Sequence, residues 1–361
     1  MKIGFDCRYV RTDHHDGISR FSARLVEHLI VLASAAGHSV TMIVSDLHQL
    51  DFLPDGHHVV VSSPTSPLEP FVAWQVNRHN FDIVFSPMQT MGSWGRKYQL
   101  LLTVHDLIYY RHPTPPRQFN PVIRLLWRLY HLSWLPQKLL LRGSDAVVAV
   151  SETTRGLILE NKLTSRPVYV VPNAADVRPS DHSTAAADQR HKSLIYMGSF
   201  MPYKNVETLA SALHALPGFS LHLLSRISDA DARRLSSLAP ADSLVIHNGT
   251  SDEEYFELLG QATALVSASR DEGFGIPLVE SMSVGTPIVV SDIPIFHEIG
   301  GQAALFADPN SADEFSSQLR ELAEPEMWLH RSQESLRQAA LFSWKRSAQK
   351  LLDVLIEVGR A

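Results

Sequence analysis

The chain has 361 residues, of which 45% are hydrophobic and 19% charged, a composition typical of a folded protein of about two domains that excludes wholesale disorder and fibrous architectures. The 32 basic and 38 acidic side chains give a net charge of −6, so there is no overall positive field and no nucleic-acid partner is expected. The single cysteine, Cys7, cannot form an internal disulfide, and no apolar run approaches the roughly 20 residues of a membrane span, so a cytoplasmic protein is expected.

Short apolar runs alternate with helical segments along the first half of the chain. Strands are predicted at residues 3–5, 40–45, 82–86 and 100–104. Between the first two, Phe21, Leu25, Leu29 and Leu32 recur at helical spacing. Strands made of continuous Val, Ile and Leu are typical of a parallel sheet that is covered by helices on both faces.

Residues 179–192 are polar and have no periodicity that could bury a face, so they are predicted to link domains at 1–178 and 193–342. After this linker, strands are predicted at residues 194–197, 221–224, 264–267 and 287–290, and a helix at 206–216. The sequence therefore predicts an α/β protein with two doubly wound, Rossmann-like domains. Ligands of such sheets lie beyond the carboxyl ends of the strands, so the site is expected in the interdomain cleft.

The most informative segment is residues 269–280 (SRDEGFGIPLVE), which follows a predicted strand. Gly275 allows the backbone to approach a ligand and Pro277 suits the first turn of a helix, so a tight loop and a phosphate-favouring helix N-terminus are predicted. The carboxylates of Glu272 on the loop and Glu280 on the first helical turn can each accept hydrogen bonds from the paired hydroxyls of a sugar. The alternative, a surface loop with two solvated acids, suits isolated glutamates better than this glycine-rich context.

A second strand, loop and helix start is predicted at residues 195–205 (IYMGSFMPYKN). Lys204 would place a mobile positive charge beside helix amides, which suits a diphosphate, although a lone lysine here would be a solvated surface charge. His105 follows the strand at 100–104 and is expected at a carboxyl edge, where it can bind a substrate hydroxyl or transfer a proton. The alternative for His105 is a histidine satisfied by a neighbouring backbone group.

Two acidic patterns resemble metal sites, but neither predicts one. Residues 13–16 (DHHD) are adjacent to one another and rarely converge on one ion, so a flexible loop is expected, and the amide of Gly17 that follows can approach an anion. The Asp-x-Asp at residues 229–231 is predicted to begin a helix capped by Ser228. No metal is therefore expected.

Residues 111–144 contain no acidic side chain. Basic and aromatic residues are interleaved along this segment: Arg111, Arg117, Arg124, Trp127, Arg128, Tyr130, Trp134, Lys138 and Arg142. One interpretation is peripheral contact with an anionic membrane surface. The other, favoured by the negative net charge of the chain, is a core-packed helix with a basic outer face.

Together these segments resemble the family 4 glycosyltransferases, which are retaining enzymes of the GT-B fold with nucleotide-sugar donors. The resemblance is carried by FDCR at residues 5–8, GISR at 17–20, TVHD at 103–106, SDAVVAVS at 144–151, VPN at 171–173, the segment 272–280, and FSW at 342–344. It implies an acceptor-side first domain, a nucleotide-binding second domain, and a final helix within 343–361 that crosses back to pack on the first domain.

The resemblance also implies roles for the predicted site residues of the second domain. Glu280 would bind the ribose of the donor. Glu272 would hold the transferred hexose together with the backbone around Phe274, Gly275 and Ile276, at the start of the predicted helix.

Further residues complete the donor site that the resemblance implies. Lys204 would neutralise the diphosphate, and Gly17, Gly198 and Ser199 would line the same site. His105 would contact the hexose near the reacting carbon. Many family members carry an arginine where this chain has Ser199, so stabilisation of the leaving group would depend more heavily on Lys204 and on helix dipoles.

The implied function is transfer of a hexose, with retention and without a metal or other cofactor, to a hydroxyl of a glycan or glycolipid acceptor, in the cytoplasm or at the inner face of the membrane. GDP-mannose is the expected donor because residues 103–113 resemble mannosyl-transferring members; UDP- and dTDP-sugars are alternatives. Two other functions stay open: a nucleotide-sugar epimerase of the same fold, and a catalytically silent nucleotide-sugar-binding protein, which Ser199 would suit.

Overall fold

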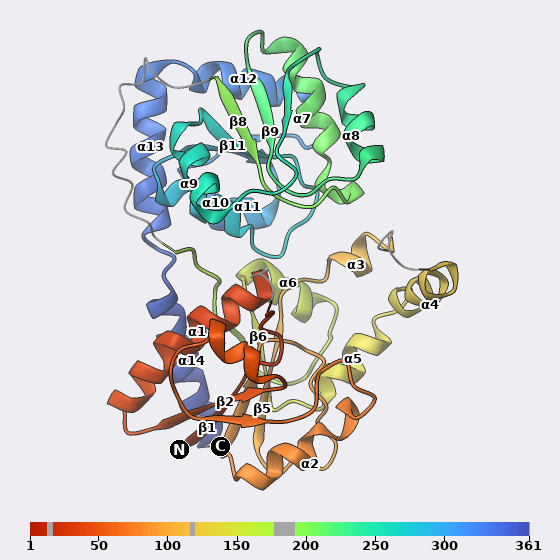
Figure 1. The fold of residues 1–361 in the computed structure, drawn as a ribbon, viewed down its shortest axis with the longest axis vertical. Helices are drawn as coiled ribbons and strands as arrows, with labels where there is room; N and C mark the ends of the chain where they lie inside the picture. Colours follow the sequence, from red (N-terminus) through yellow and green to blue (C-terminus); the bar gives the residue numbers. More distant parts are fainter. Residues whose placement is uncertain (13–16, 116–119, 177–191, 361) are drawn as a thin grey trace. The chain divides into compact units, whose positions relative to one another are not determined.

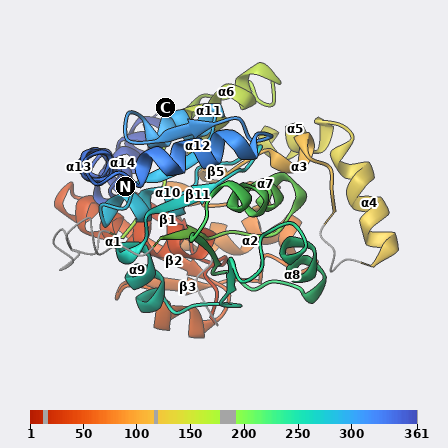
Figure 2. The same ribbon diagram turned by 90° about the horizontal axis from the view of Figure 1, so that it is seen from above.

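The computed structural model describes residues 1–12, 17–115, 120–176 and 192–360. They form two compact units, one made of Met1–Ala174 with Ser343–Ala361 and the other of Ala175–Phe342. Each unit is a sheet with helices packed against it (Figure 1), and the same elements are seen from a second direction in Figure 2. The DHHD run at residues 13–16, and the predicted linker except for its last residue, lie outside the described residues.

The first unit contains a seven-stranded parallel sheet in the order β3-β2-β1-β4-β5-β6-β7. Its strands are β1 Lys2–Asp6, β2 Ser39–Val44, β3 His58–Val60, β4 Ile83–Ser86, β5 Gln99–Val104, β6 Ala146–Ala149 and β7 Val168–Val170. Ile3 of β1 pairs with Val40 on one side and with Ile83 on the other. All three side chains are buried, as a sheet covered on both faces requires.

Two helices distant in sequence pack together in the first unit, α1 (Gly17–Ala35) and α14 (Trp344–Gly359). α1 buries the face that contains Phe21, at the predicted helical spacing. The side chain of Ser343 caps the first turn of α14, and the ring of Trp344 lies 6.0 Å from that of Phe21. The C-terminal helix is therefore part of the first unit, although the whole second unit precedes it in the sequence.

The remaining helices of the first unit are α2 Val72–Val76, α3 Ile108–Arg111, α4 Pro121–His131, α5 Leu135–Arg142, α6 Glu152–Glu160, and the short 3-10 helices η1 Leu47–Phe52, η2 Glu69–Phe71 and η3 Asn77–His79. α5 buries Gln137 and Leu141, but α4 has no buried residue. Both views show α4 standing apart from the sheet of its unit (Figures 1 and 2). The prediction of a core-packed helix is therefore wrong for α4, because an amphipathic pattern does not say what covers its apolar face.

The second unit contains a six-stranded parallel sheet in the order β10-β9-β8-β11-β12-β13. Its strands are β8 Ser193–Tyr196, β9 Ser220–Leu223, β10 Leu244–Ile246, β11 Ala264–Ser267, β12 Ile288–Ser291 and β13 Leu305–Ala307. Leu265 of β11 pairs with Ile195 of β8 and with Ile288 of β12. Both units thus have the doubly wound architecture that the alternation of apolar and helical segments predicted.

The helices of the second unit are α7 Val206–Ala212, α8 Asp229–Ser236, α9 Asp252–Gln261, α10 Ile276–Ser283, α11 Pro294–Gly300, α12 Ala312–Leu322, α13 Pro325–Ala339, and the 3-10 helices η5 Pro202–Lys204 and η6 Leu213–Ala215. α7 and α12 share a hydrophobic cluster with Tyr196 and Leu223, while α10 packs against α9, α11 and α13. The helix predicted at 206–216 is divided into α7 and η6, and it ends before Pro217 and Gly218, which has a φ of 81°. The strands β3, β6, β7, β10 and β13 were not predicted. All of them except β6 have only three residues, which do not define a period.

Candidate active site

The topological switch point of the second unit lies between β8 and β11, which are neighbours in the sheet. From β8 the chain continues to β9 and β10 on one side, and from β11 it continues to β12 and β13 on the other. In such sheets ligands bind beyond the carboxyl ends of the strands at this point. The loops of the two motifs singled out in the sequence directly follow these two strands.

These two loops bring Lys204 and Glu272 together as an ion pair between Nζ and Oε1. The two side chains are only 14% and 15% exposed, so the pair is largely shielded from water and interacts more strongly than a surface pair. Ser269 Oγ donates a further hydrogen bond of 3.3 Å to the same carboxylate oxygen. The structure therefore places side by side the cation and the acid that the sequence predicted for a diphosphate and a hexose.

Backbone and side-chain hydrogen bonds between the loops fix the position of Lys204. The next residue, Asn205, has a φ of 53°, and its side-chain amide donates to the carbonyl oxygen of Ala268 at 3.1 Å. Asparagine adopts this left-handed conformation more readily than most residues. The amide of Arg270 in turn donates to the carbonyl oxygen of Tyr203 at 2.8 Å. These bonds tie the loops after β8 and β11 to one another.

Gly275 forms the start of α10. Its φ of 91° lies in the left-handed region, where a residue with a side chain would be strained. The preceding Phe274 is buried, and its ring meets Phe342 edge-to-face at 5.7 Å. The N-terminus of α10 carries the positive end of the helix dipole, and the amide of Ile276 precedes the helix's own acceptors. Pro277 has no N–H, and the Leu278 amide donates to the carbonyl oxygen of Gly275 at 3.0 Å. This loop can therefore present backbone donors to an anion.

Glu280 lies at the fifth position of α10. The prediction placed Glu280 in the first turn, but it lies in the second turn because the helix begins at Ile276. The side chain is 3% exposed, and its Oε2 accepts a 3.0 Å hydrogen bond from the Tyr255 hydroxyl on α9. Tyr255, which was not predicted as a site residue, thus orients the carboxylate that is predicted to bind the ribose. A tyrosine on a neighbouring helix offered no signal in the sequence.

The loop after β8 requires a glycine at position 198. The Gly198 amide donates to Ser225 Oγ at 3.1 Å, and a Cβ atom there would lie 2.9 Å from Tyr196 Oη. The Tyr196 hydroxyl donates to the carbonyl oxygen of the exposed Ser199 at 2.6 Å. Burial, and then the charge of Glu272, raises the pKa of Tyr196, so this hydroxyl stays protonated near neutral pH.

Two of the predicted site residues belong to the first unit. His105 directly follows β5, and its Nε2 lies 2.8 Å from the carbonyl oxygen of Pro87. Because a carbonyl oxygen only accepts, Nε2 carries the hydrogen in this geometry. The predicted alternative, a histidine that bonds a neighbouring backbone group, is therefore confirmed for Nε2. The His105 ring also meets Phe21 of α1 edge-to-face at 5.1 Å. Gly17 is the first residue of α1 and is exposed.

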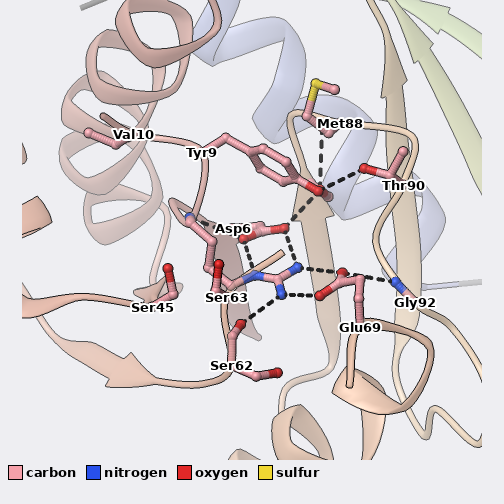
Figure 3. A network of polar contacts seen from close by, with 12 residues as sticks. Asp6, Tyr9, Val10, Ser45, Ser62, Ser63, Glu69, Met88, Thr90 and Gly92 are labelled. Carbon is pink, nitrogen blue, oxygen red and sulfur yellow. Dashed lines mark hydrogen bonds and ion pairs between the residues drawn. The ribbon is translucent and has the colours of Figure 1, made fainter. Parts of the chain in front are cut away.

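A buried charge cluster that was not predicted lies at the carboxyl ends of β1 and β4, the switch point of the first unit (Figure 3). Arg8 Nε lies 2.8 Å from Asp6 Oδ1, and Arg8 Nη1 lies 2.6 Å from Glu69 Oε2. Ser86 Oγ donates to Asp6 Oδ2 at 2.9 Å. The amide of Gly92 donates to Glu69 Oε1 at 3.2 Å. The cluster joins β1, β4, η2 and the loop that follows β4.

Burial and neighbouring charges shift the pKa values of two residues at this cluster, Arg8 and Tyr9. Burial alone would lower the pKa of Arg8, but the carboxylates of Asp6 and Glu69 raise it above its usual value, so the guanidinium stays charged. Burial, and then Asp6, also raises the pKa of Tyr9, whose hydroxyl lies 2.8 Å from Thr90 Oγ1. The one signal for this cluster in the sequence is the pair of charged residues directly after an apolar strand.

No group of three or more His, Cys, Asp or Glu side chains within the described residues could hold a metal ion. The helix start predicted at residues 229–231 is confirmed, because Ser228 Oγ accepts a hydrogen bond from the Asp231 amide and caps α8. In the same described part of the chain, no helix has both the length and the apolar character needed to cross a membrane.

Comparison with known proteins decides the family. The profile described as "Glycosyltransferase Family 4" matches residues 15–178, and the profile described as "Glycosyl transferases group 1" matches residues 177–340. The chain belongs to the family 4 glycosyltransferases. The enzyme class predicted from the sequence, a glycosyltransferase, is thereby confirmed.

Curated relatives of this glycosyltransferase are mannosyltransferases. O-antigen chain mannosyltransferase B of Escherichia coli is 26% identical over 72% of this chain and 70% of its own length. O-antigen chain mannosyltransferase RfbU of Salmonella typhimurium is 26% identical over 78% of this chain and 81% of its own. The GDP-mannose:cellobiosyl-diphosphopolyprenol alpha-mannosyltransferase of Xanthomonas oryzae is 31% identical over 44% of this chain and 43% of its own.

Solved structures support the fold of the glycosyltransferase over its whole length. Sucrose-phosphate synthase of Thermosynechococcus elongatus matches with a TM-score of 0.73 at 19% identity, covering 99% of this chain and 98% of its own. Anabaena HepE in complex with UDP and glucose matches with a TM-score of 0.72 at 16% identity, covering 99% and 100%. The predicted GT-B fold class, with two Rossmann-like halves and a C-terminal helix in the first unit, is confirmed.

Proposed function

We propose that this glycosyltransferase transfers mannose from GDP-mannose, with retention and without a metal or other cofactor, to a hydroxyl of a glycan or lipid-linked acceptor. The names of the relatives support mannose as the sugar, and one of them states both GDP-mannose and a diphosphopolyprenol acceptor. Within this chain, the observation that carries the proposal is the shielded pair of Lys204 and Glu272 at the switch point of the second unit.

In this proposal a nucleotide-sugar donor exchanges the partners of that pair. The Lys204 ammonium turns to the diphosphate, and Glu272 accepts hydrogen bonds from the hexose hydroxyls. The Ile276 amide and the dipole of α10 add partial positive charge for the same phosphates. Glu280, oriented by Tyr255, accepts hydrogen bonds from the ribose hydroxyls. Each group thus meets the part of the donor that its charge suits.

The reaction breaks the bond between the anomeric carbon and a diphosphate oxygen and forms a bond from the acceptor oxygen on the same face. The acceptor's proton passes to the departing diphosphate. Negative charge grows on this leaving group, and Lys204 with the N-terminus of α10 stabilises it. Ser199 adds no charge of its own, so the contribution of Lys204 is correspondingly large. His105 contacts the hexose near the reacting carbon.

The proposal includes peripheral contact with an anionic membrane through residues 111–144. On α4, Val122, Leu126 and Leu129 lie at helical spacing and are 55–67% exposed. Arg124 and Arg128 on the same helix supply positive charge. An exposed helix with an apolar stripe and basic side chains is typical of helices that lie at a membrane interface. A lipid-linked acceptor would be reached from such a position.

The test combines binding with product analysis. Thermal unfolding is measured with GDP-mannose, UDP-glucose and dTDP-glucose, since a ligand stabilises the fold according to RT ln(1 + [L]/Kd). We expect the largest stabilisation from GDP-mannose, and transfer of labelled mannose to lipid extracts with release of GDP. Isomerised donor without transfer would indicate an epimerase, and stabilisation without turnover a silent binding protein. Either result would overturn the proposed activity.

A further inference from the structure

Cationic side chains gather around a hollow in the first unit, outside the predicted donor motifs. The hollow has a volume of about 440 Å³ and is lined by Lys138, Arg142, Lys162, Leu163, Thr164, Ser165 and Arg166. None of these lining residues is acidic, and four of them carry a positive charge. Like charges that surround one hollow repel each other, and a bound anion would turn this repulsion into attraction.

The hollow is built on a packed scaffold. Lys138 and Arg142 lie one turn apart on α5 and so project from the same side of the helix. Leu141 of α5 and Leu163 of the loop after α6 belong to the same buried cluster, which fixes the two walls relative to each other. Lys162 has a φ of 48°, in the left-handed region that favours glycine or asparagine, yet a lysine occupies it. The cations are therefore carried by well-anchored backbone.

The position of the hollow separates it from the reaction. Arg142 precedes β6 and Arg166 precedes β7, and these two strands are parallel neighbours. The hollow therefore lies toward the amino ends of the strands, whereas His105 follows the carboxyl end of β5. Reactants of a doubly wound sheet meet at the carboxyl edge. An anion held in the hollow therefore serves to attach the protein and does not take part in the chemistry.

An apolar row runs along α5 beside the cationic row. Leu135 and Leu139, one turn apart, are each 59% exposed. The neighbouring row on the same helix consists of Lys138 and Arg142, which line the hollow. Apolar side chains next to cations are typical of a membrane interface, where the former enter the acyl region and the latter meet the phosphates. A small free anion would make no use of the apolar row.

We propose that the hollow lined by Lys138, Arg142, Lys162 and Arg166 binds the phosphate group of an anionic membrane lipid. This inference rests on the membrane contact in the proposed function and adds a specific lipid site to it. α4 and α5 then lie along the same lipid surface, with the exposed leucines of both helices in the apolar layer. The hollow sets which lipids hold the first unit at the membrane.

The test is co-sedimentation with vesicles of phosphatidylglycerol and phosphatidylcholine. The double variant Arg142→Gln/Arg166→Gln is compared with Lys345→Gln/Lys350→Gln, which removes the same charge from exposed lysines of α14 in the same unit. A cation at an anionic surface strengthens binding by about fivefold, so the hollow variant should bind about 25-fold more weakly than the wild type. The α14 variant should stay within about threefold of the wild type, because its lysines lie outside the hollow. Cooperative thermal unfolding of the wild type and of both double variants is the control that each protein is folded.

Each outcome decides a different claim. Equal weakening of the two double variants would overturn the lipid site, because net charge alone would then explain binding. Wild-type protein that binds neither anionic nor neutral vesicles would overturn both the site and the membrane contact. Mannosyl transfer from GDP-mannose to a detergent-solubilised acceptor, measured on the same samples, reports on the proposed activity separately.

Discussion

The switch points of the two units use charge in opposite ways. In the second unit a single pair, Lys204 and Glu272, lies between glycine-bearing loops and keeps some exposure to water. In the first unit Arg8 is enclosed by two carboxylates, and Asp6 accepts a further bond from Ser86, so the cluster is saturated within the protein (Figure 3). A pair that can exchange partners suits a ligand, whereas a saturated buried cluster fixes shape. Under the proposed function, the same sheet edge serves donor binding in the second unit and rigidity in the first.

The largest effect is expected from breaking the cluster of the first unit. Arg8→Met leaves the carboxylates of Asp6 and Glu69 without their cation, which should lower the free energy of unfolding by about 3–5 kcal/mol. Urea denaturation measures this loss. Arg24→Met is the matched control, because Arg24 pairs with Glu27 on the surface and such pairs contribute at most about 1 kcal/mol. Equal losses in both variants would show that the cluster has no special structural role.

Removing the cation of the second unit should affect catalysis and leave the fold stable. Lys204→Met deletes the charge proposed to stabilise the leaving diphosphate, and loss of one such group typically lowers kcat roughly 10²- to 10³-fold. Steady-state mannosyl transfer measures this, with urea denaturation as the check on folding. Lys350→Met, on the exposed face of α14, should retain full activity. Activity of Lys204→Met within threefold of the wild type would argue against the assigned role.

A smaller effect is expected from the group that orients Glu280. Tyr255→Phe removes the hydroxyl that donates to its carboxylate, and affinity for GDP should fall about 5- to 10-fold, the value of one such hydrogen bond. Binding of 2′,3′-dideoxy-GDP should not change, because that ligand lacks the ribose hydroxyls. Tyr169→Phe is the matched control, since its hydroxyl donates to Glu357 in the first unit. Equal weakening toward both nucleotides would assign Tyr255 a merely structural role.

The smallest effect on stability concerns Cys7, which lies between Asp6 and Arg8 of the charge cluster. Burial, and then the charge of Asp6, raises the pKa of the Cys7 thiol. The folded state therefore favours the neutral thiol over the thiolate. The free energy of unfolding keeps its full value below the thiol's ordinary pKa and falls as the pH rises above it, because the unfolded chain then loses the thiol proton more readily than the folded protein. At about pH 8 the folded protein should react with a thiol reagent at least about 100-fold more slowly than the unfolded chain. Rapid labelling of the folded protein would show that this part of the core is open.

The sequence predicted the features that depend on local chemistry. The apolar strands, the helical spacing of α1 and the start of α10 at a left-handed glycine all follow from patterns of a few residues. Neighbouring strands then brought Lys204 and Glu272 together, because both predicted loops follow adjacent strands of one sheet. Parallel strand order made this long-range contact predictable.

Features that depend on distant partners could not be predicted. Glu69 reaches Arg8 from 61 residues away, and Tyr255 reaches Glu280 from another helix. Neither Glu69 nor Tyr255 lies in a motif or follows an apolar strand. The exposure of α4 was missed for a related reason, since amphipathic spacing shows that a helix has an apolar face but does not identify its cover.

The most direct test of the account is calorimetric titration of GDP and GDP-mannose into the wild type and Glu272→Gln. The substitution keeps the shape of the side chain but removes the charge that pairs with Lys204. If the pair forms the donor site, GDP should bind at least as tightly as before, while GDP-mannose should bind about tenfold more weakly through loss of its hexose contact. Unchanged affinity for GDP-mannose, or an equal loss for both ligands, would contradict the account.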